Sequence, residues 1–148
     1  MALVPMVSAV ATDDPEMAAL VPGNGDESEV RRQMTLFVER VTNMWSEGKL
    51  DVPDHIESFE RFDERVSGGL DHVMDREGRG RRIAIVTSGG PISISLQRAL
   101  DLSHDVMWRT AWVIRNASIT EFLYRHDAFS LVSFNAVPHL SGDLITYR

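Results

Sequence analysis

The feature that most constrains this fold is an apolar run that stops abruptly at small residues and a proline. Residues 82–92 read RIAIVTSGGPI. The 82–87 segment is continuous and rich in β-branched side chains, which is typical of a strand buried on both faces in an α/β sheet. Pro91 suits the first turn of a helix, where its missing N–H is not needed. The stretch therefore predicts a buried strand, a glycine turn and then a helix over 92–100.

A turn of this kind has a chemical use as well as a structural one. Backbone N–H groups at a helix N-terminus, together with the helix dipole, bind anions. Gly89 and Gly90 would let a ligand approach the backbone closely, and ligands of open α/β sheets bind beyond the carboxyl ends of strands. The alternative is that the glycine pair only turns a corner, and the pattern alone does not distinguish the two.

Helical periodicity precedes this stretch. One amphipathic helix is predicted between Ser28, a candidate N-cap, and Gly48, a candidate stop, and a second over 56–77. The pair Gly68 and Gly69 inside the second helix indicates a close approach of another element.

Strand-like runs follow the stretch. Residues 103–108 predict a short helical turn. The predicted strands cover residues 111–115, 118–124 and 129–137, and the last two are joined by a hairpin turn at 125–127. Helices and strands together indicate an α/β protein.

Composition excludes several classes of function. The chain has 148 residues, which suits one domain, and a formal net charge of −7. Nucleic-acid binding normally needs a basic face, so we expect no nucleic-acid partner. The chain has no cysteine, which removes disulfides and thiolate catalysis and fits a reducing compartment, so we expect a cytoplasmic protein.

The first residues do not indicate a membrane or secretory segment. Residues 1–11 are apolar, but no Lys or Arg precedes them, Pro5 interrupts the run, and it is too short to cross a bilayer. We therefore expect no signal peptide and no membrane partner. Residues 12–28 are rich in Asp, Glu, Gly and Pro and predict a flexible loop.

Four separated segments, in the right order, resemble one family. Residues 83–92, IAIVTSGGPI, resemble the late strand and loop of the histidine phosphatase superfamily, in a branch with Thr-Ser-Gly-Gly-Pro where many members have Ser-His-Gly-Gly. Residues 57–66 (ESFERFDERV) resemble the preceding helix. Residues 108–122 (WRTAWVIRNASITEF) resemble the late strands, and residues 131–140 (LVSFNAVPHL) the last strand and tail.

The resemblance implies a fold and an activity. It implies a phosphoglycerate mutase-like α/β fold, with three layers and a mostly parallel sheet flanked by helices, as a single domain over residues 1–148. The family hydrolyses phosphomonoesters or transfers phosphoryl groups without a metal or other cofactor. The implied partner is a small phosphorylated substrate or inorganic phosphate.

One motif of the family is absent from this sequence. The family begins with a strand ending in Arg-His-Gly, whose histidine attacks the phosphoryl group. Arg125-His126 begins that motif but Asp127 follows it, and turn chemistry predicts an exposed turn residue at His126. No histidine has the spacing of a metal site; the five are His55, His72, His104, His126 and His139.

We therefore expect a truncated, incomplete domain that lacks the first strand and the catalytic histidine and is inactive alone. Two alternatives stay open: a non-catalytic phosphate-binding or regulatory module, and a poorly folding remnant. Loss of the first strand would expose a sheet edge, through which a homo-oligomer could form.

Site roles follow from the resemblance, residue by residue. Ser88 falls at the position of the family's second active-site histidine, and its hydroxyl donates one hydrogen bond but brings no positive charge. The N–H of Gly89 is a second implied phosphate contact. Thr87 would shape the turn. Asn116, at a strand end, is a further candidate contact, with a polar cap of a turn as the alternative.

Overall fold

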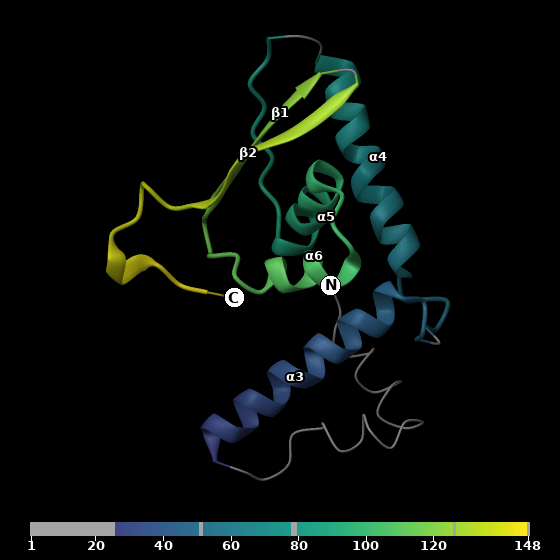
Figure 1. Ribbon diagram of the computed structural model, residues 1–148, viewed down its shortest axis with the longest axis vertical. Coiled ribbons are helices and arrows are strands. Elements are labelled where there is room, and N and C mark those ends of the chain that lie inside the picture. Colours follow the sequence, from purple (N-terminus) through teal and green to yellow (C-terminus); the bar gives the residue numbers. More distant parts are fainter. Residues whose placement is uncertain (1–25, 51, 78–79, 126, 148) are drawn as a thin grey trace. The chain divides into compact units, whose positions relative to one another are not determined.

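A computed structural model describes residues 26–50, 52–77, 80–125 and 127–147. The chain divides into two compact units, Met1–Phe62 and Asp63–Arg148, and each is treated by itself below. The described elements combine helices with one small sheet (Figure 1), so the chain is mixed α/β. The predicted single domain over 1–148 stays a prediction. Residues 1–25, with most of the predicted 12–28 loop, lie outside the described residues.

The first unit is built on helix α3, Glu27–Ser46. Asp26 caps it, because its carboxylate accepts hydrogen bonds from the N–H groups of Ser28 and Glu29 at 2.9 and 3.0 Å. The pKa of Asp26 is lowered, most strongly by a hydrogen bond from the Ser28 hydroxyl and also by these two hydrogen bonds from backbone N–H groups. The predicted cap, Ser28, is thus wrong by two residues. Gly48 follows the helix with φ +66°, where glycine has no steric cost.

The buried stripe of α3 forms the core of the first unit. Phe37, Val41 and Trp45 recur every four residues, which places them on one helix face. The Trp45 ring meets Phe59 edge-to-face at 5.3 Å between ring centroids. Its indole N–H donates to the backbone carbonyl of Glu57 at 3.1 Å. Trp45 therefore ties α3 to the chain just before α4.

Helix α4, Phe59–Glu77, confirms the second predicted helix with a later start. The close approach expected at Gly68 and Gly69 is wrong. Both residues are exposed, and a Cβ atom on either would meet nothing within 4 Å. Neither glycine is needed for packing among the described residues.

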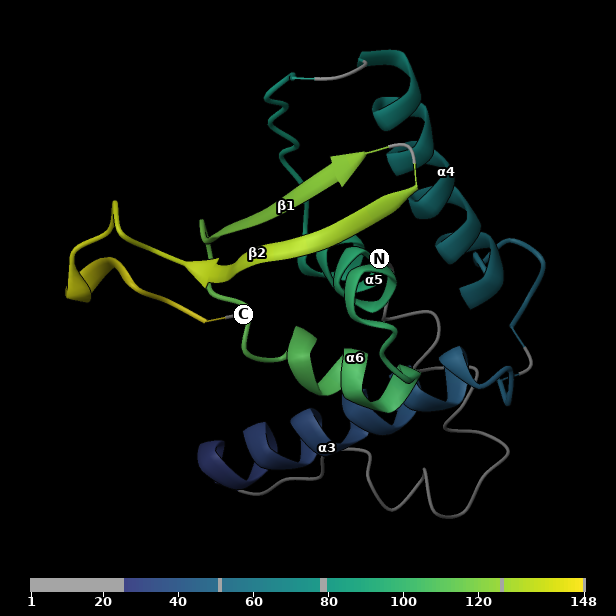
Figure 2. The same cartoon turned by 45° about the horizontal axis from the view of Figure 1, so that its top comes forward.

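The second unit contains a β-hairpin whose second strand packs on a helix (Figures 1 and 2). Strands β1, Ile119–Arg125, and β2, Ala128–Ala136, pair antiparallel with Phe122 opposite Leu131. Helix α5, Gly89–Leu100, contacts β2 and helix α6, His104–Ala111. These elements confirm the predicted hairpin and the two predicted helical segments.

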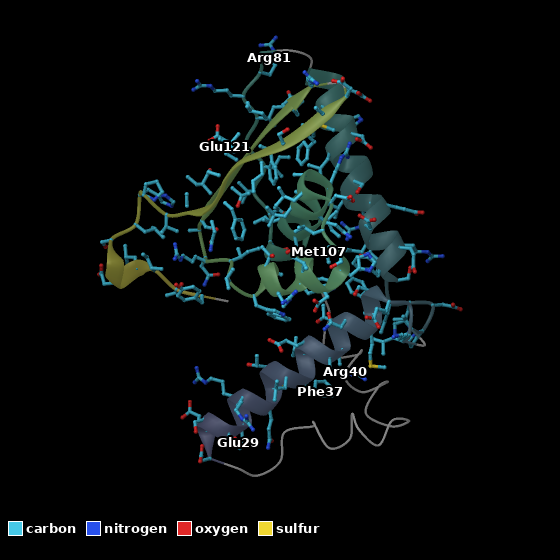
Figure 3. The ribbon with its side chains drawn as sticks, viewed as in Figure 1. Glu29, Phe37, Arg40, Arg81, Met107 and Glu121 are labelled. Carbon is cyan, nitrogen blue, oxygen red and sulfur yellow. The ribbon has the colours of Figure 1, made fainter. Side chains whose placement is uncertain are left out.

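The predicted mostly parallel sheet is wrong for the described residues. Their one sheet has two strands, and these are antiparallel. One face of the hairpin is half-buried, with Phe122 stacked on Phe129 at 4.6 Å between ring centroids. The other face is exposed, and Figure 3 shows Glu121 on the side turned away from α5.

The 82–87 segment is not a strand, which corrects the central prediction of the sequence. All six residues are exposed and have no regular secondary structure. Val86 is 100% exposed and Ile85 56%. A strand exists only as part of a hydrogen-bonded ladder, and no described strand pairs with this segment. High β-propensity without a pairing partner does not make a strand.

The predicted strand over 111–115 is also wrong. Helix α6 extends to Ala111, and residues 112–113 form a turn. Asn135 holds this turn: its side-chain carbonyl accepts the N–H of Arg115 at 2.8 Å, and its amide donates to the carbonyl of Val113 at 2.6 Å. The side chain of Asn135 therefore binds one backbone N–H and one backbone carbonyl that would otherwise be available to pair with a neighbouring strand.

The core of the second unit is formed by residues of α4, α5 and α6 and by one residue that follows α6. Its buried apolar residues are Val66, Ile94, Leu96, Met107, Trp108, Ala111 and Ile114. Arg98 connects α5 to α4, with 2.6 Å between a guanidinium nitrogen and the Asp71 carboxylate. The same guanidinium lies 5.6 Å from the ring centroid of Phe129. None of the described helices is long and apolar enough to cross a bilayer.

Candidate functional site

The candidate site is the N-terminal end of α5, where the glycine turn predicted from the sequence is found. Ser88 occupies the N-cap position with φ −100° and ψ 174°, and Gly89 and Gly90 are the first two helical residues. Pro91 follows in the first turn, as expected. The helix thus begins directly at the small residues that end the apolar run.

Three hydrogen-bond donors at this helix end have no acceptor among the described residues. The Ser88 side chain makes no capping hydrogen bond. The N–H groups of Gly89 and Gly90 donate to no described backbone acceptor. Pro91 has no N–H, and the N–H of Ile92 donates to the carbonyl of Ser88 at 3.4 Å between nitrogen and oxygen. The unused donors are therefore one hydroxyl and two adjacent amides.

The electrostatics of this helix end favour an anion. No acidic residue lies in the first turn of α5, so the positive end of the helix dipole has no carboxylate beside it. Other helices of this chain differ: α3 has Asp26 as its cap and α6 is capped by the Ser103 hydroxyl. Ser88 is exposed, whereas the two glycines are buried.

The serines within α5 serve the helix itself. The Ser93 hydroxyl donates to the carbonyl of Gly89 at 2.8 Å, and the Ser95 hydroxyl donates to that of Pro91 at 2.9 Å. Both bonds run back along the helix, as buried helical serines commonly do. They occupy carbonyls of the first turn and leave its amides unused.

Thr87 and Asn116, the two further candidates, differ in their surroundings. Thr87 is exposed and directly precedes the cap. The side-chain amide of Asn116 donates to the Thr146 hydroxyl at 3.0 Å and to the carbonyl of Tyr147 at 3.4 Å. The side-chain amide of Asn116 therefore holds the C-terminal segment.

His126, the second residue of the pair Arg125-His126, lies outside the described residues. Its neighbours Arg125 and Asp127 form an ion pair with 2.7 Å between the charged atoms. Within the described ranges, no three His, Asp or Glu side chains gather as a metal site would require.

Comparison with protein families decides what this helix end belongs to. The family model of the histidine phosphatase superfamily (branch 1) matches residues 23–137. The chain belongs to the histidine phosphatase superfamily. The match includes the glycine turn, α5 and both strands of the hairpin. Comparison with curated proteins finds no match, and comparison with solved structures finds none either.

The sequence predicted the helix end and, through the resemblance, the Ser88 hydroxyl and the Gly89 N–H as donors, but it did not single out the N–H of Gly90. It missed that the residues before the turn would be exposed. Arg81 and Arg82, which begin that exposed stretch, were assigned no role.

Proposed function

We propose that the chain binds the phosphate group of a small phosphomonoester, or inorganic phosphate, at the N-terminal end of α5. The Ser88 hydroxyl and the amides of Gly89 and Gly90 donate hydrogen bonds to the phosphate oxygens. The single observation that carries this proposal is that these three adjacent donors have no acceptor among the described residues. Membership in the histidine phosphatase superfamily supports it.

We also propose that these 148 residues bind phosphate without transferring it. Covalent phosphoryl transfer needs a nucleophile, and the sequence has no Arg-His-Gly. Ser88 belongs to a Thr-Ser-Gly-Gly-Pro branch in which the second histidine is replaced, so its hydroxyl supplies a hydrogen bond but no cationic charge. Asn116 is left out of the proposed site because its amide already holds residues 146–147.

Binding is tested by charge at the N-cap. Ser88→Asp places a carboxylate where the phosphate would bind, while aspartate is itself a good N-cap for α5. We expect inorganic phosphate to raise the melting temperature of the wild-type chain, as a ligand of the folded state must, and to have no effect on Ser88→Asp. Titration calorimetry with phosphate checks the same result.

The control is Ser103→Asp, which adds the same charge at the N-cap of α6. That serine already caps its helix through its side chain, so the variant should keep wild-type phosphate affinity. Equal loss in both variants would indicate a general charge effect and contradict the proposed site. Absence of any phosphate binding by the folded wild-type chain would also contradict it.

Turnover is tested with p-nitrophenyl phosphate in the presence of a chelator. We expect the purified chain to hydrolyse it no faster than buffer does, and His126→Ala to behave identically. Chelator-resistant hydrolysis that disappears in His126→Ala would show that the chain carries its own nucleophile, and it would overturn the proposal of binding without transfer.

A further inference from the structure

Residues 81–88 form an exposed stretch whose backbone has no strand partner in the part of the chain that the structure describes. Every one of them is exposed, and Ile83, Ile85 and Val86 are 37%, 56% and 100% exposed. Among the described residues, none of their N–H groups donates a backbone hydrogen bond. Apolar side chains beside unused backbone donors and acceptors are a template for pairing with another strand.

We propose that two copies of the chain pair antiparallel along residues 82–88, and that each copy thereby brings its Arg82 to the other copy's Ser88. The pairing itself rests on the exposed stretch alone. The role of Arg82 rests on the proposed phosphate site. A second copy is the occupant that the stretch fits, because two-fold pairing matches the apolar run with itself.

Charge decides the direction of the pairing. Both charged residues of the stretch, Arg81 and Arg82, lie at its beginning, and no charged residue follows before Arg98. Parallel pairing would place the arginines of both copies side by side, and like charges opposite one another are destabilising. Antiparallel pairing moves them to opposite ends of the paired strands.

Symmetry and apolar matching decide the register. Side chains alternate between the two faces of a strand, and residues directly opposite one another point to the same face. In an antiparallel pair with two-fold symmetry, the central residue of each strand must therefore lie opposite its own copy. With Ile85 at that centre, Ala84 faces Val86 and Ile83 faces Thr87, so that every inner pair is apolar or β-branched. With Ala84 at the centre, Arg82 would face the apolar Val86. The register centred on Ile85 is therefore favoured.

This register has a consequence for the phosphate site. It places the partner's Arg82 directly opposite Ser88, where Cβ atoms of paired residues are about 4.5–5.5 Å apart. The partner's Arg81 lies on the opposite face of the pair, because successive side chains of a strand alternate between the two faces. The guanidinium of Arg82 has five N–H donors and matches phosphate oxygens in pairs. The second copy supplies the positive charge that Ser88 lacks.

A single introduced cysteine tests the register, because the chain has none of its own. In the proposed pair, Ile85→Cys places the two sulfur atoms opposite one another, within disulfide range. We expect mild oxidation to convert Ile85→Cys into a covalent dimer. The matched variant Ala84→Cys, one residue away and also exposed, should stay monomeric on a denaturing gel. Equal cross-linking of the two variants, or cross-linking of neither, overturns the register.

Sedimentation equilibrium of the full chain tests the pairing. We expect a reversible dimer that Ile85→Lys weakens at least about tenfold, because two ammonium groups then face one another. Leu123→Lys is the control, since Leu123 is 66% exposed on the hairpin, outside the stretch, and it should dimerise as the wild type does. A wild-type chain that stays monomeric, or a dimer that Ile85→Lys leaves intact, overturns the pairing.

Inorganic phosphate tests the role of Arg82. We expect phosphate to tighten the wild-type dimer, and Arg82→Gln to abolish that effect while the dimer still forms; Arg109→Gln, an exposed arginine on α6, is the control. Phosphate that binds without tightening the dimer overturns the arginine contacts and leaves the proposed function standing. A dimer sensitive to Ile85→Lys in a chain that binds no phosphate instead overturns the proposed function and, with it, the arginine role.

Discussion

At the scale of single residues, Asn135 shows how one side chain replaces a strand. Its backbone has φ +58°, a conformation that asparagine adopts more readily than most residues. From there its side-chain amide reaches both Val113 and Arg115. A run of β-branched residues before Arg115 indicated a strand, and one asparagine twenty residues later decides otherwise.

Substitution of Asn135 separates its two contributions. Asn135→Ala removes both side-chain hydrogen bonds and disfavours the positive φ, and we expect the free energy of unfolding to fall by about 1–3 kcal/mol. Asn135→Gly accommodates the φ but still lacks the bonds, so it should lose less. Urea denaturation followed by circular dichroism measures both. Equal stability of all three chains would mean that the bonds are not needed to hold the turn.

At the scale of elements, local patterns predicted those structures that depend on local forces. Helices α3 and α4 follow from apolar residues at helical spacing, and α5 begins where glycines precede Pro91. The hairpin of β1 and β2 follows from two strand-like runs joined by a short turn. Each of these elements finds its hydrogen-bond partners within itself or in its neighbour along the chain.

Helix α4 carries two glycines that its structure does not use. Gly69 is exposed and its φ is not positive. A Cβ atom added at this residue would meet nothing within 4 Å. We expect Gly69→Ala to stabilise the chain by about 0.5–1 kcal/mol, because alanine loses less backbone entropy in a helix. Thermal melting checks this. Gly48→Ala is the contrasting variant, since φ +66° strains alanine and should lower the melting temperature.

At the scale of the whole molecule, burial rather than polarity distinguishes the residues that support the second unit. Met107 on α6, labelled in Figure 3, is 0% exposed, whereas Leu100 at the end of α5 is 49% exposed. We expect Met107→Ala to lower the free energy of unfolding by about 2–5 kcal/mol through lost burial and a residual cavity. Leu100→Ala, measured by the same chemical denaturation, should cost much less. Similar losses would mean that the core is not where the burial places it.

By itself, the sequence determined the helices, the hairpin, the glycine turn at the start of α5 and the family. These depend on side-chain periodicity, on glycine and proline geometry and on residue identity, all of which are local properties. Only the tertiary structure decided that the 82–87 segment has no ladder, that Asn135 holds a turn and that Asn116 binds the C-terminal segment. Strand pairing and side-chain partners depend on which distant residues come together, and no local pattern encodes that choice.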